Sequence, residues 1–188
     1  MGLIGDIGAW VLKEACIRGA SLPHPLRVAV NLSPTQLLKP GFALEVARIV
    51  GESKFSPRRL ELEITESAFL LENSATLACL NDLRRLGISI ALDDFGTGFS
   101  ALSHLRVFPV DRIKIDRSFV QEADNNPETA SIIRAIIGLA RELGVRTTAE
   151  GIETEAQLRA LKSLGCDEIQ GYLVSRPKPL EAFQNLEE

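Results

Sequence analysis

The chain has 188 residues, of which 45% are hydrophobic and 24% are charged, and its formal net charge is −4. This length and apolar content suit one globular domain with its own core and exclude a disordered chain. The mildly acidic balance gives no basic surface for a nucleic-acid duplex or an anionic membrane, and no apolar run is long enough to span a bilayer. The N-terminus lacks the pattern of a signal peptide. We therefore expect a cytoplasmic protein that holds any phosphate-bearing ligand through a few local contacts.

The first part of the chain predicts a helix, a strand and another helix. Apolar residues at helical spacing predict an amphipathic helix over residues 2–19, with Trp10 on its apolar face and therefore in the core. Residues 27–32 predict a strand, Ser33-Pro34 begins a helical turn, and residues 44–50 predict a helix.

Residues 60–66 alternate apolar and acidic side chains, which is typical of a strand with two unlike faces. Two interpretations of the acidic face remain open. Glu61 and Glu63 lie on a solvated face if the sheet is open to water on that side. In a closed parallel barrel the same face is the interior, and an acid near the end of the strand enters the mouth of the active site.

The most distinctive stretch, residues 87–100, is a short apolar run that ends on two adjacent carboxylates and a glycine-rich turn. The run at 88–92 predicts a buried strand after a helix over 73–86, so Asp93 and Asp94 stand at the end of that strand. Adjacent carboxylates repel each other and lose hydration when they are partly buried, so a cation commonly keeps both ionised. The alternative is a surface pair that caps the next helix.

The rest of the chain continues the same alternation of strands and helices. Strands are predicted at 110–116, 145–151 and 168–171, and helices at 127–143, 155–164 and 180–186. A βα unit repeated along the whole chain predicts an α/β fold of parallel strands with flanking helices, in a single domain over 1–188.

Polar residues fall at the C-terminal ends of these successive strands. An open sheet gathers ligands at its switch point, whereas a barrel gathers polar residues from every strand at one mouth. The pattern favours the barrel, but a (β/α)8 barrel has eight strands and this sequence predicts six. We therefore expect an incomplete TIM-like barrel. The strand-end residues are Asn31, Glu63, Asp93, Asp94, Lys114, Glu150 and Gln170.

This set offers oxygen ligands without thiolate or imidazole, which suits Mg²⁺ or Mn²⁺. A bridging carboxylate such as Asp93 can hold two ions that activate water for phosphodiester hydrolysis. Glu150 then serves as a general base or orients the water, and Lys114 fixes the nucleophile or neutralises developing negative charge. Each residue alone also has a structural interpretation, as a helix cap or a core ion pair.

Six motifs together resemble the EAL domain, the bacterial phosphodiesterase that linearises cyclic di-GMP. They appear in the order and at the spacing of that family, from residue 2 to about residue 179. The motifs are Asn31-Leu32-Ser33, Glu63-Ile64-Thr65-Glu66, Asp93-Asp94-Phe95-Gly96-Thr97-Gly98, Ile113-Lys114-Ile115-Asp116, Ala149-Glu150-Gly151-Ile152-Glu153 and Gln170-Gly171-Tyr172.

The resemblance implies a two-metal site with Mg²⁺ or Mn²⁺, a cyclic di-GMP substrate, a linear pGpG product and a homodimer. It also implies that Lys114 and Glu150 lie near the attacking water and that Glu66 anchors the glycine-rich loop after Asp94. The implied metal ligands are Asn31, Glu63, Asp93 and Asp94, and the implied substrate-lining or supporting residues are Gln170, Glu66, Asp116 and Glu153.

The sequence departs from the family at its N-terminus. The family begins with about two strands and a helix before the position of Gly2, and that segment carries the Glu-Ala-Leu signature, whose Glu is a metal ligand, and a phosphate-binding arginine. Without these first two strands, we expect weak or absent phosphodiesterase activity from this chain alone. We also expect its exposed barrel edges to cause self-association.

Two alternatives stay open. The first is a non-catalytic cyclic di-GMP receptor or a dimerising interaction module in bacterial signalling. The second is an active enzyme in which another chain fills the gap, or in which an acid such as Glu61 or Glu153 replaces the missing ligand.

Overall fold

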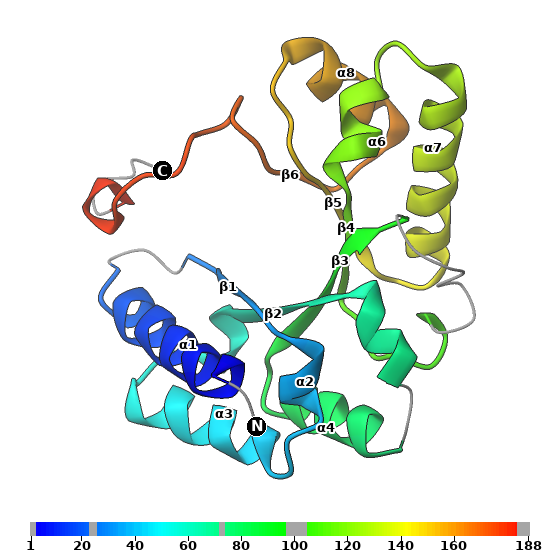
Figure 1. The fold of residues 1–188 in the computed structure, drawn as a ribbon. Coiled ribbons are helices and arrows are strands. Elements are labelled where there is room, and N and C mark those ends of the chain that lie inside the picture. The colour runs from blue at the N-terminus through cyan, green and yellow to red at the C-terminus, as the bar shows by residue number, and fades with distance from the viewer. Residues whose placement is uncertain (1–2, 23–25, 72–73, 97–104, 184–188) are drawn as a thin grey trace. The chain divides into compact units, whose positions relative to one another are not determined.

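A computed structural model of the chain describes residues 3–22, 26–71, 74–96 and 105–183. The chain divides into two compact units, whose elements are labelled in Figure 1. Unit 1 comprises Met1–Ile90, Val107–Pro109 and Lys178–Glu188, and unit 2 comprises Ala91–Arg106 and Val110–Pro177.

Unit 1 is built on a pair of parallel strands covered by helices. Strand β1 (Val28–Asn31) pairs with β2 (Leu60–Thr65), so that Val28 lies opposite Leu60 and Asn31 lies opposite Glu63. Helix α1 packs against β1 and α3, and α3 packs against α4. The other elements are α1 (Ile4–Ala20), α2 (Pro34–Leu37), α3 (Phe42–Glu52), η1 (Pro57–Arg59), η2 (Glu66–Leu71), α4 (Ser74–Arg85) and η3 (Leu180–Phe183).

Both faces of β2 are buried. The apolar face carries Leu60, Leu62 and Ile64, which are almost completely excluded from water. The acidic face is buried as well, since Glu61 is 6% exposed and Glu63 is 8% exposed. The interpretation of this face as solvated is therefore wrong. A buried carboxylate needs a partner, and Arg27 Nη1 lies 3.6 Å from Glu61 Oε2.

Arg59 joins the end of α1 to the start of β1. Its Nη2 donates to the Gly19 carbonyl at 3.0 Å, and its Nε donates to the Leu26 carbonyl at 2.8 Å. The guanidinium also lies over the Phe55 ring, 4.9 Å from its centroid. Charge-assisted hydrogen bonds of this kind are among the stronger local contacts.

Trp10 is not in the core, contrary to the sequence prediction. It is 63% exposed, whereas Leu12, Cys16 and Gly19 on the other face of α1 are buried. The prediction is wrong because apolar residues occur around most of the circumference of α1, and only one face can pack on β1 and α3.

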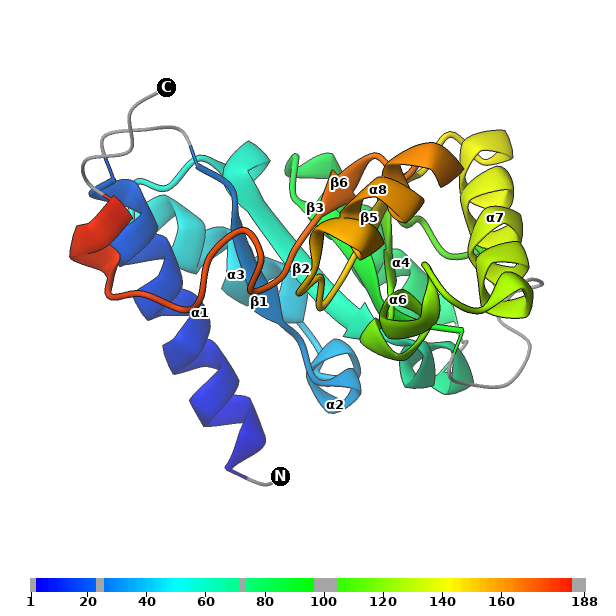
Figure 2. The ribbon, with the colours of Figure 1, turned by 90° about the horizontal axis from the view of Figure 1, so that it is seen from above.

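Unit 2 contains parallel strands that pair in chain order. Strand β3 begins in unit 1 and runs into unit 2, where it pairs with β4; β4 pairs with β5, and β5 pairs with β6. Helix α7 packs on β4 and β5 and touches α6 and α8, as the two views of the ribbon show (Figures 1 and 2). The elements are β3 (Ser89–Phe95), β4 (Arg112–Ile115), α6 (Arg117–Glu122), α7 (Pro127–Glu142), β5 (Arg146–Ala149), α8 (Glu155–Leu164) and β6 (Glu168–Ile169).

The helix ends of unit 2 follow from local sequence. Thr154 Oγ1 accepts the Gln157 N–H at 3.2 Å, and Gln157 Oε1 accepts the Thr154 N–H at 3.0 Å, which caps α8 reciprocally. Gly165, with φ of +86°, ends this helix in a conformation that favours glycine. Asn126 caps α7 by accepting the N–H groups of Glu128 and Thr129.

The predicted fold class is confirmed as α/β: the described residues form six strands, parallel in the pairings given for each unit, with flanking helices. Two differences concern helices. The six-residue helix α6 was not predicted, and the predicted helix at 180–186 is a short 3-10 helix over Leu180–Phe183, with 184–188 outside the described residues. No helix in the described part of the chain combines the length and the apolar character that crossing a bilayer requires.

Candidate active site

A bulge in β3 places both aspartates against the same residue of β4. Leu92 pairs with Ile113 and Phe95 pairs with Ile115, so Asp93 and Asp94 together lie opposite the single residue Lys114. Neighbouring side chains of a regular strand point to opposite faces. Here the extra residue, and the φ of +54° at Asp94, bring carboxylate oxygens of both aspartates within 4.8 Å of each other. The sequence prediction placed Asp93 and Asp94 at the C-terminal end of this strand, and β3 continues one residue beyond them, to Phe95.

Lys114 is the buried cation of this cluster. It is 4% exposed, and its Nζ lies 3.1 Å from Asp93 Oδ1 and 2.7 Å from Glu150 Oε1. Glu150 directly follows β5, and its backbone N–H donates to the Ile115 carbonyl at 3.1 Å, which fixes the start of this loop beside β4. The carboxylate of Glu150 completes a group of three with Asp93 and Asp94, whose ligand atoms all lie within 4.8 Å of one another.

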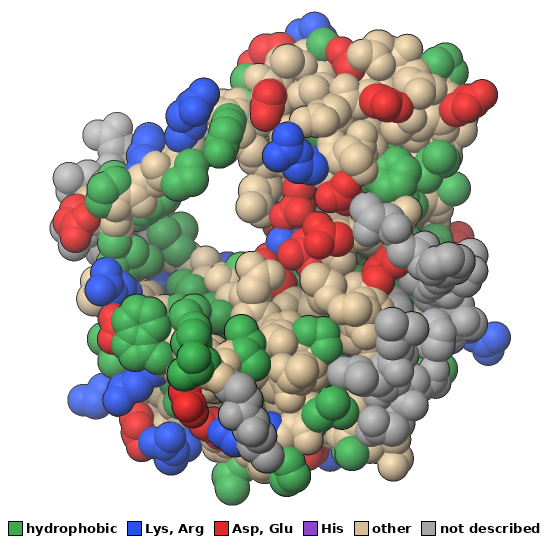
Figure 3. Space-filling view, viewed as in Figure 1, with side chains coloured by type: hydrophobic (Ala, Val, Ile, Leu, Met, Phe, Trp, Pro, Cys, Tyr) green, Lys and Arg blue, Asp and Glu red, His purple; other side chains and the backbone are tan. Residues whose placement is uncertain are grey.

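The cluster carries more negative than positive charge. Burial raises the pKa of the Asp94 carboxyl, the charges of Asp93 and Asp116 raise it further, and Lys114 opposes them. Three close carboxylates around one ammonium form the oxygen-rich, anionic donor set that hard divalent cations prefer. The residues therefore fit a divalent metal ion. Figure 3 shows acidic side chains gathered on the face of unit 2 where β3, β4 and β5 lie.

Asp116 follows Lys114 on the chain and caps α6. Its Oδ1 accepts the Ser118 N–H at 2.9 Å and the Ser118 hydroxyl at 2.5 Å. Burial alone would raise the pKa of Asp116, but these hydrogen bonds and the charge of Arg117 hold it below its usual value. The charge of Asp116 in turn raises the pKa of Asp94, and the supporting role of Asp116 stays a prediction.

Of the remaining predicted site residues in unit 2, Gln170 and Glu153 have exposed side chains. Their backbones are fixed, because the Gln170 N–H donates to the Ala149 carbonyl at 2.8 Å and the Glu153 N–H donates to Gln157 Oε1 at 2.8 Å. Among the described residues, neither side chain hydrogen-bonds to the carboxylate cluster. Their predicted contact with substrate stays a prediction.

Three predicted site residues belong to unit 1. Asn31 and Glu63 are register partners at the ends of β1 and β2, and Glu66 begins η2. The structure thus places Asn31 opposite the buried Glu63 in the strand register of this unit. Their role as metal ligands stays a prediction. The loop that Glu66 is expected to anchor falls at 97–104, outside the described residues.

The sequence interpretation missed Arg112. This residue is 4% exposed, and its Nη1 donates to Thr148 Oγ1 at 2.7 Å and lies 2.7 Å from Glu168 Oε2. Because Arg112 and Lys114 are two apart on β4, they share one face of the strand. Arg112 thus links β4 to β5 and β6 on the face that carries Lys114. The sequence signal that could have identified Arg112 was the spacing of two cations, two residues apart, on one predicted strand.

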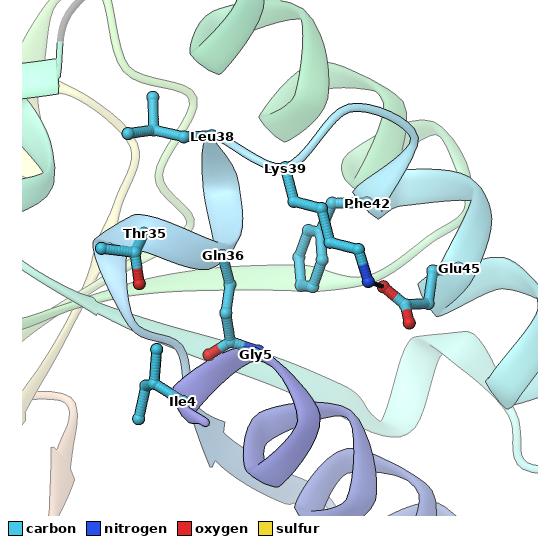
Figure 4. Close-up of a pocket in the computed structure, with 8 residues that line it drawn as sticks. All are labelled: Ile4, Gly5, Thr35, Gln36, Leu38, Lys39, Phe42 and Glu45. Carbon is cyan, nitrogen blue, oxygen red and sulfur yellow. Dashed lines mark hydrogen bonds and ion pairs between the residues drawn. The ribbon is translucent and has the colours of Figure 1, made fainter. Parts of the chain in front are cut away.

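A cavity of about 340 Å³ in unit 1 is a different feature (Figure 4). Its charged pair is satisfied, since Lys39 Nζ lies 2.8 Å from Glu45 Oε2, and Gln36 Oε1 accepts the Ser33 N–H at 3.1 Å. None of the predicted site residues lines it. We therefore assign the candidate active site to the carboxylate cluster and not to this cavity. The lining residues are Ile4, Gly5, Thr35, Gln36, Leu38, Lys39, Phe42 and Glu45.

The family model described as EAL domain matches residues 1–177. The chain belongs to the EAL domain family. This confirms the resemblance carried by the sequence motifs. An uncharacterized signaling protein of Caulobacter vibrioides is 48% identical to this EAL domain over 182 residues, which are 97% of this chain and 22% of the relative.

A second relative is the bifunctional diguanylate cyclase/cyclic di-GMP phosphodiesterase MucR of Pseudomonas aeruginosa, 40% identical over 186 residues, which cover 96% of this chain and 27% of MucR. This EAL domain thus spans about a quarter of the length of these relatives. The solved complex of the PaMucR phosphodiesterase with c-di-GMP matches with a TM-score of 0.89 and 40% identity, over 96% of this chain and 75% of that chain.

Metal ions occur in another solved relative. The Klebsiella pneumoniae BlrP1 complex with manganese and c-di-GMP matches with a TM-score of 0.86 and 28% identity, over 92% of this chain and 45% of that chain. A calcium complex of the same protein also matches. The carboxylate cluster of the present EAL domain is of the kind that binds such ions.

Proposed function

We propose that this EAL domain is a cytoplasmic, metal-dependent phosphodiesterase that uses Mg²⁺ or Mn²⁺ to hydrolyse cyclic di-GMP to linear pGpG. The observation that carries the proposal is the cluster of Asp93, Asp94 and Glu150, whose carboxylate oxygens lie within 4.8 Å of one another around the buried Lys114. The relatives support the substrate, since MucR is named a cyclic di-GMP phosphodiesterase and was solved with c-di-GMP. Three free cysteines suit a reducing compartment such as the cytoplasm.

In this proposal the bulged pair Asp93 and Asp94 holds the divalent cation. When bound, such an ion supplies Lewis acidity and lowers the pKa of water. Asp93 is held in place by its own ion pair with Lys114 at 3.1 Å and by the Asp94 N–H, which donates to Asp93 Oδ1 at 3.1 Å. The Asp93 carboxylate is therefore held in position by the protein's own contacts.

Glu150 and Lys114 are assigned to the reacting water. The Glu150 carboxylate, oriented by the Lys114 ammonium at 2.7 Å, accepts the proton of the water that attacks phosphorus. The ammonium stabilises the negative charge that grows on the phosphoryl oxygens as one phosphorus–oxygen ester bond breaks. Hydrolysis adds one water across one of the two phosphodiesters, which opens the ring and leaves linear pGpG.

The test is incubation of the purified chain with cyclic di-GMP and Mg²⁺ or Mn²⁺, followed by chromatographic separation of the nucleotides. Because the departure at the N-terminus predicts weak activity, we expect slow pGpG formation by the parent chain and none by Asp93→Asn. Asp82→Asn is the matched control, since Asp82 is an exposed aspartate on α4 that pairs with the exposed Arg85. Equal turnover by Asp93→Asn and by the parent chain would contradict the assignment.

A binding measurement separates catalysis from recognition. Calorimetric titration with Mn²⁺ alone is expected to show binding to the parent chain and to Asp82→Asn, and none to Asp93→Asn. Cyclic di-GMP binding without any pGpG formation would favour the receptor alternative over the phosphodiesterase. Glu63→Ala tests the predicted ligand of unit 1 in the same two assays.

A further inference from the structure

The two buried cations of β4 follow one pattern of contacts. Arg112 is in register with Arg146 of β5, but its Nη1 donates to Thr148 Oγ1 at 2.7 Å. Lys114 is in register with Thr148, but its Nζ lies 2.7 Å from Glu150 Oε1. Each cation thus reaches the residue two positions beyond its register partner. The two contacts are therefore successive steps of one diagonal on the same face of the sheet.

The lower step continues to a third strand. The Nη1 atom of Arg112 lies 2.7 Å from Glu168 Oε2, and its Nη2 donates to Glu168 Oε1 at 3.0 Å. Such a bidentate pair fixes orientation as well as distance. We call Arg112, Thr148 and Glu168 the supporting layer, because each member stands two residues before a predicted site residue of unit 2. Those site residues are Lys114, Glu150 and Gln170.

Burial and charge indicate what the supporting layer does. Arg112 and Thr148 are 4% and 6% exposed, so the guanidinium depends on partners within the protein. The Glu168 carboxylate also offsets a positive charge that stands two residues from Lys114 on the same face, and two like charges at that spacing oppose each other. The exposed Arg146 lies 3.5 Å from the same carboxylate. The layer thus fixes β5 against β4 and leaves the Lys114 ammonium to its carboxylates.

We propose that Arg112, Thr148 and Glu168 are positioning residues, which hold β5 where Glu150 meets Lys114. They act through these two residues and not on the substrate. The inference rests on the proposed function, because there Glu150 and Lys114 are assigned to the reacting water. A misplacement of about 1 Å in such a pair is enough to slow a reaction by about 100-fold.

The first test uses neither metal nor substrate. In a chain with ¹⁵N-labelled lysine, nuclear magnetic resonance measures how fast the Lys114 ammonium exchanges its protons with water, and Lys114→Met identifies the signal. We expect exchange at least about tenfold faster in Thr148→Val, which keeps the shape of the side chain but removes the acceptor of Arg112. Glu168→Gln is expected to act in the same direction. Thr148→Ser, which restores the hydroxyl, is expected to stay within about twofold of the parent chain.

A matched control separates positioning from a general loss of stability. Thr129 is a buried threonine on α7, whose hydroxyl donates to Glu122 Oε2 at 2.8 Å. Thr129→Val therefore removes a comparable charge-assisted hydrogen bond from the same unit, away from β4, β5 and β6. We expect it to leave the exchange of the Lys114 ammonium within about twofold of the parent value.

Kinetics supply the second test. Thr148→Val is expected to lower kcat about tenfold and to change KM by less than about twofold, because the supporting layer acts on the reacting pair and not on substrate binding. A parent chain that forms no pGpG contradicts the proposed function, and the ammonium exchange then still decides the positioning role. That role is overturned if the Lys114 ammonium is unprotected in the parent chain, if Thr148→Val leaves its exchange unchanged, or if Thr129→Val accelerates the exchange equally.

Discussion

Replacing the buried Lys114 by methionine tests the electrostatic account of the cluster. The substitution keeps the length of the side chain but removes the ammonium that lies 3.1 Å from Asp93 and 2.7 Å from Glu150. Each contact corresponds to roughly 5 kcal/mol of attraction at an effective dielectric constant of about 20, and most of this offsets the cost of burying the charges. The side chains of Asp93 and Glu150 are 13% and 18% exposed, so water can partly solvate their charges once the ammonium is gone. We expect the free energy of unfolding to fall by about 3 kcal/mol.

The assay is urea denaturation followed by circular dichroism, first in a metal chelator and then with Mn²⁺. A bound cation replaces the missing positive charge, so Mn²⁺ is expected to stabilise Lys114→Met more than the parent chain; an ion at about 100 times its dissociation constant adds about 2.7 kcal/mol. Lys162→Met, at an exposed position of α8, is the control and is expected to change stability by less than about 0.5 kcal/mol. A Lys114→Met chain as stable as the parent in chelator, or equal Mn²⁺ stabilisation of both, would refute the reasoning.

Three further predictions concern stability and use the same urea assay. The Asp167 carboxylate accepts hydrogen bonds from the Thr147 N–H and hydroxyl. Burial alone would raise the pKa of Asp167, but these hydrogen bonds hold it below its usual value. Asp167→Asn is therefore expected to lower the free energy of unfolding by about 1 kcal/mol at pH 7. That cost is expected to shrink as the pH falls below about 4, because a depressed pKa stabilises the fold only while the carboxylate stays ionised; a constant cost across this range would contradict it. Arg59→Ala removes two hydrogen bonds to carbonyls and the contact with the Phe55 ring. We expect it to lower the free energy of unfolding by about 2–3 kcal/mol. Asn126→Ala removes the cap of α7 and is expected to cost about 1 kcal/mol, whereas Asn126→Asp is expected to retain most of the stability.

The sequence predicted elements best where local signals mark both ends. Residues 155–164 were predicted with the bounds that α8 has, because Thr154 caps its start and Gly165 ends it. Helix α6 was missed because six residues are too few to show a helical period. The exposed position of Trp10 was not predictable either, since periodicity shows that a helix has an apolar face but not which part of it the tertiary structure covers.

The candidate site was predictable in its members but not in its geometry. Parallel strands bring their C-terminal ends to one edge, and this rule alone placed Asp93, Lys114 and Glu150 together. The bulge in β3 and the pairing of Lys114 with two carboxylates depend on register and side-chain rotamers, which no spacing along the chain encodes. The same limit explains why Gln170 was grouped with the cluster although its side chain makes no described contact there.

The left-handed backbone of Asp94 restricts which residues can replace it during evolution. At a φ of +54° glycine is unstrained, and asparagine and aspartate are the other residues that adopt this conformation most readily. Of these three, only aspartate carries a charge that can hold a metal ion. A lineage released from selection for catalysis is therefore expected to drift first to asparagine or glycine at this position. The residue found there in a descendant would indicate whether selection for the proposed metal site had continued.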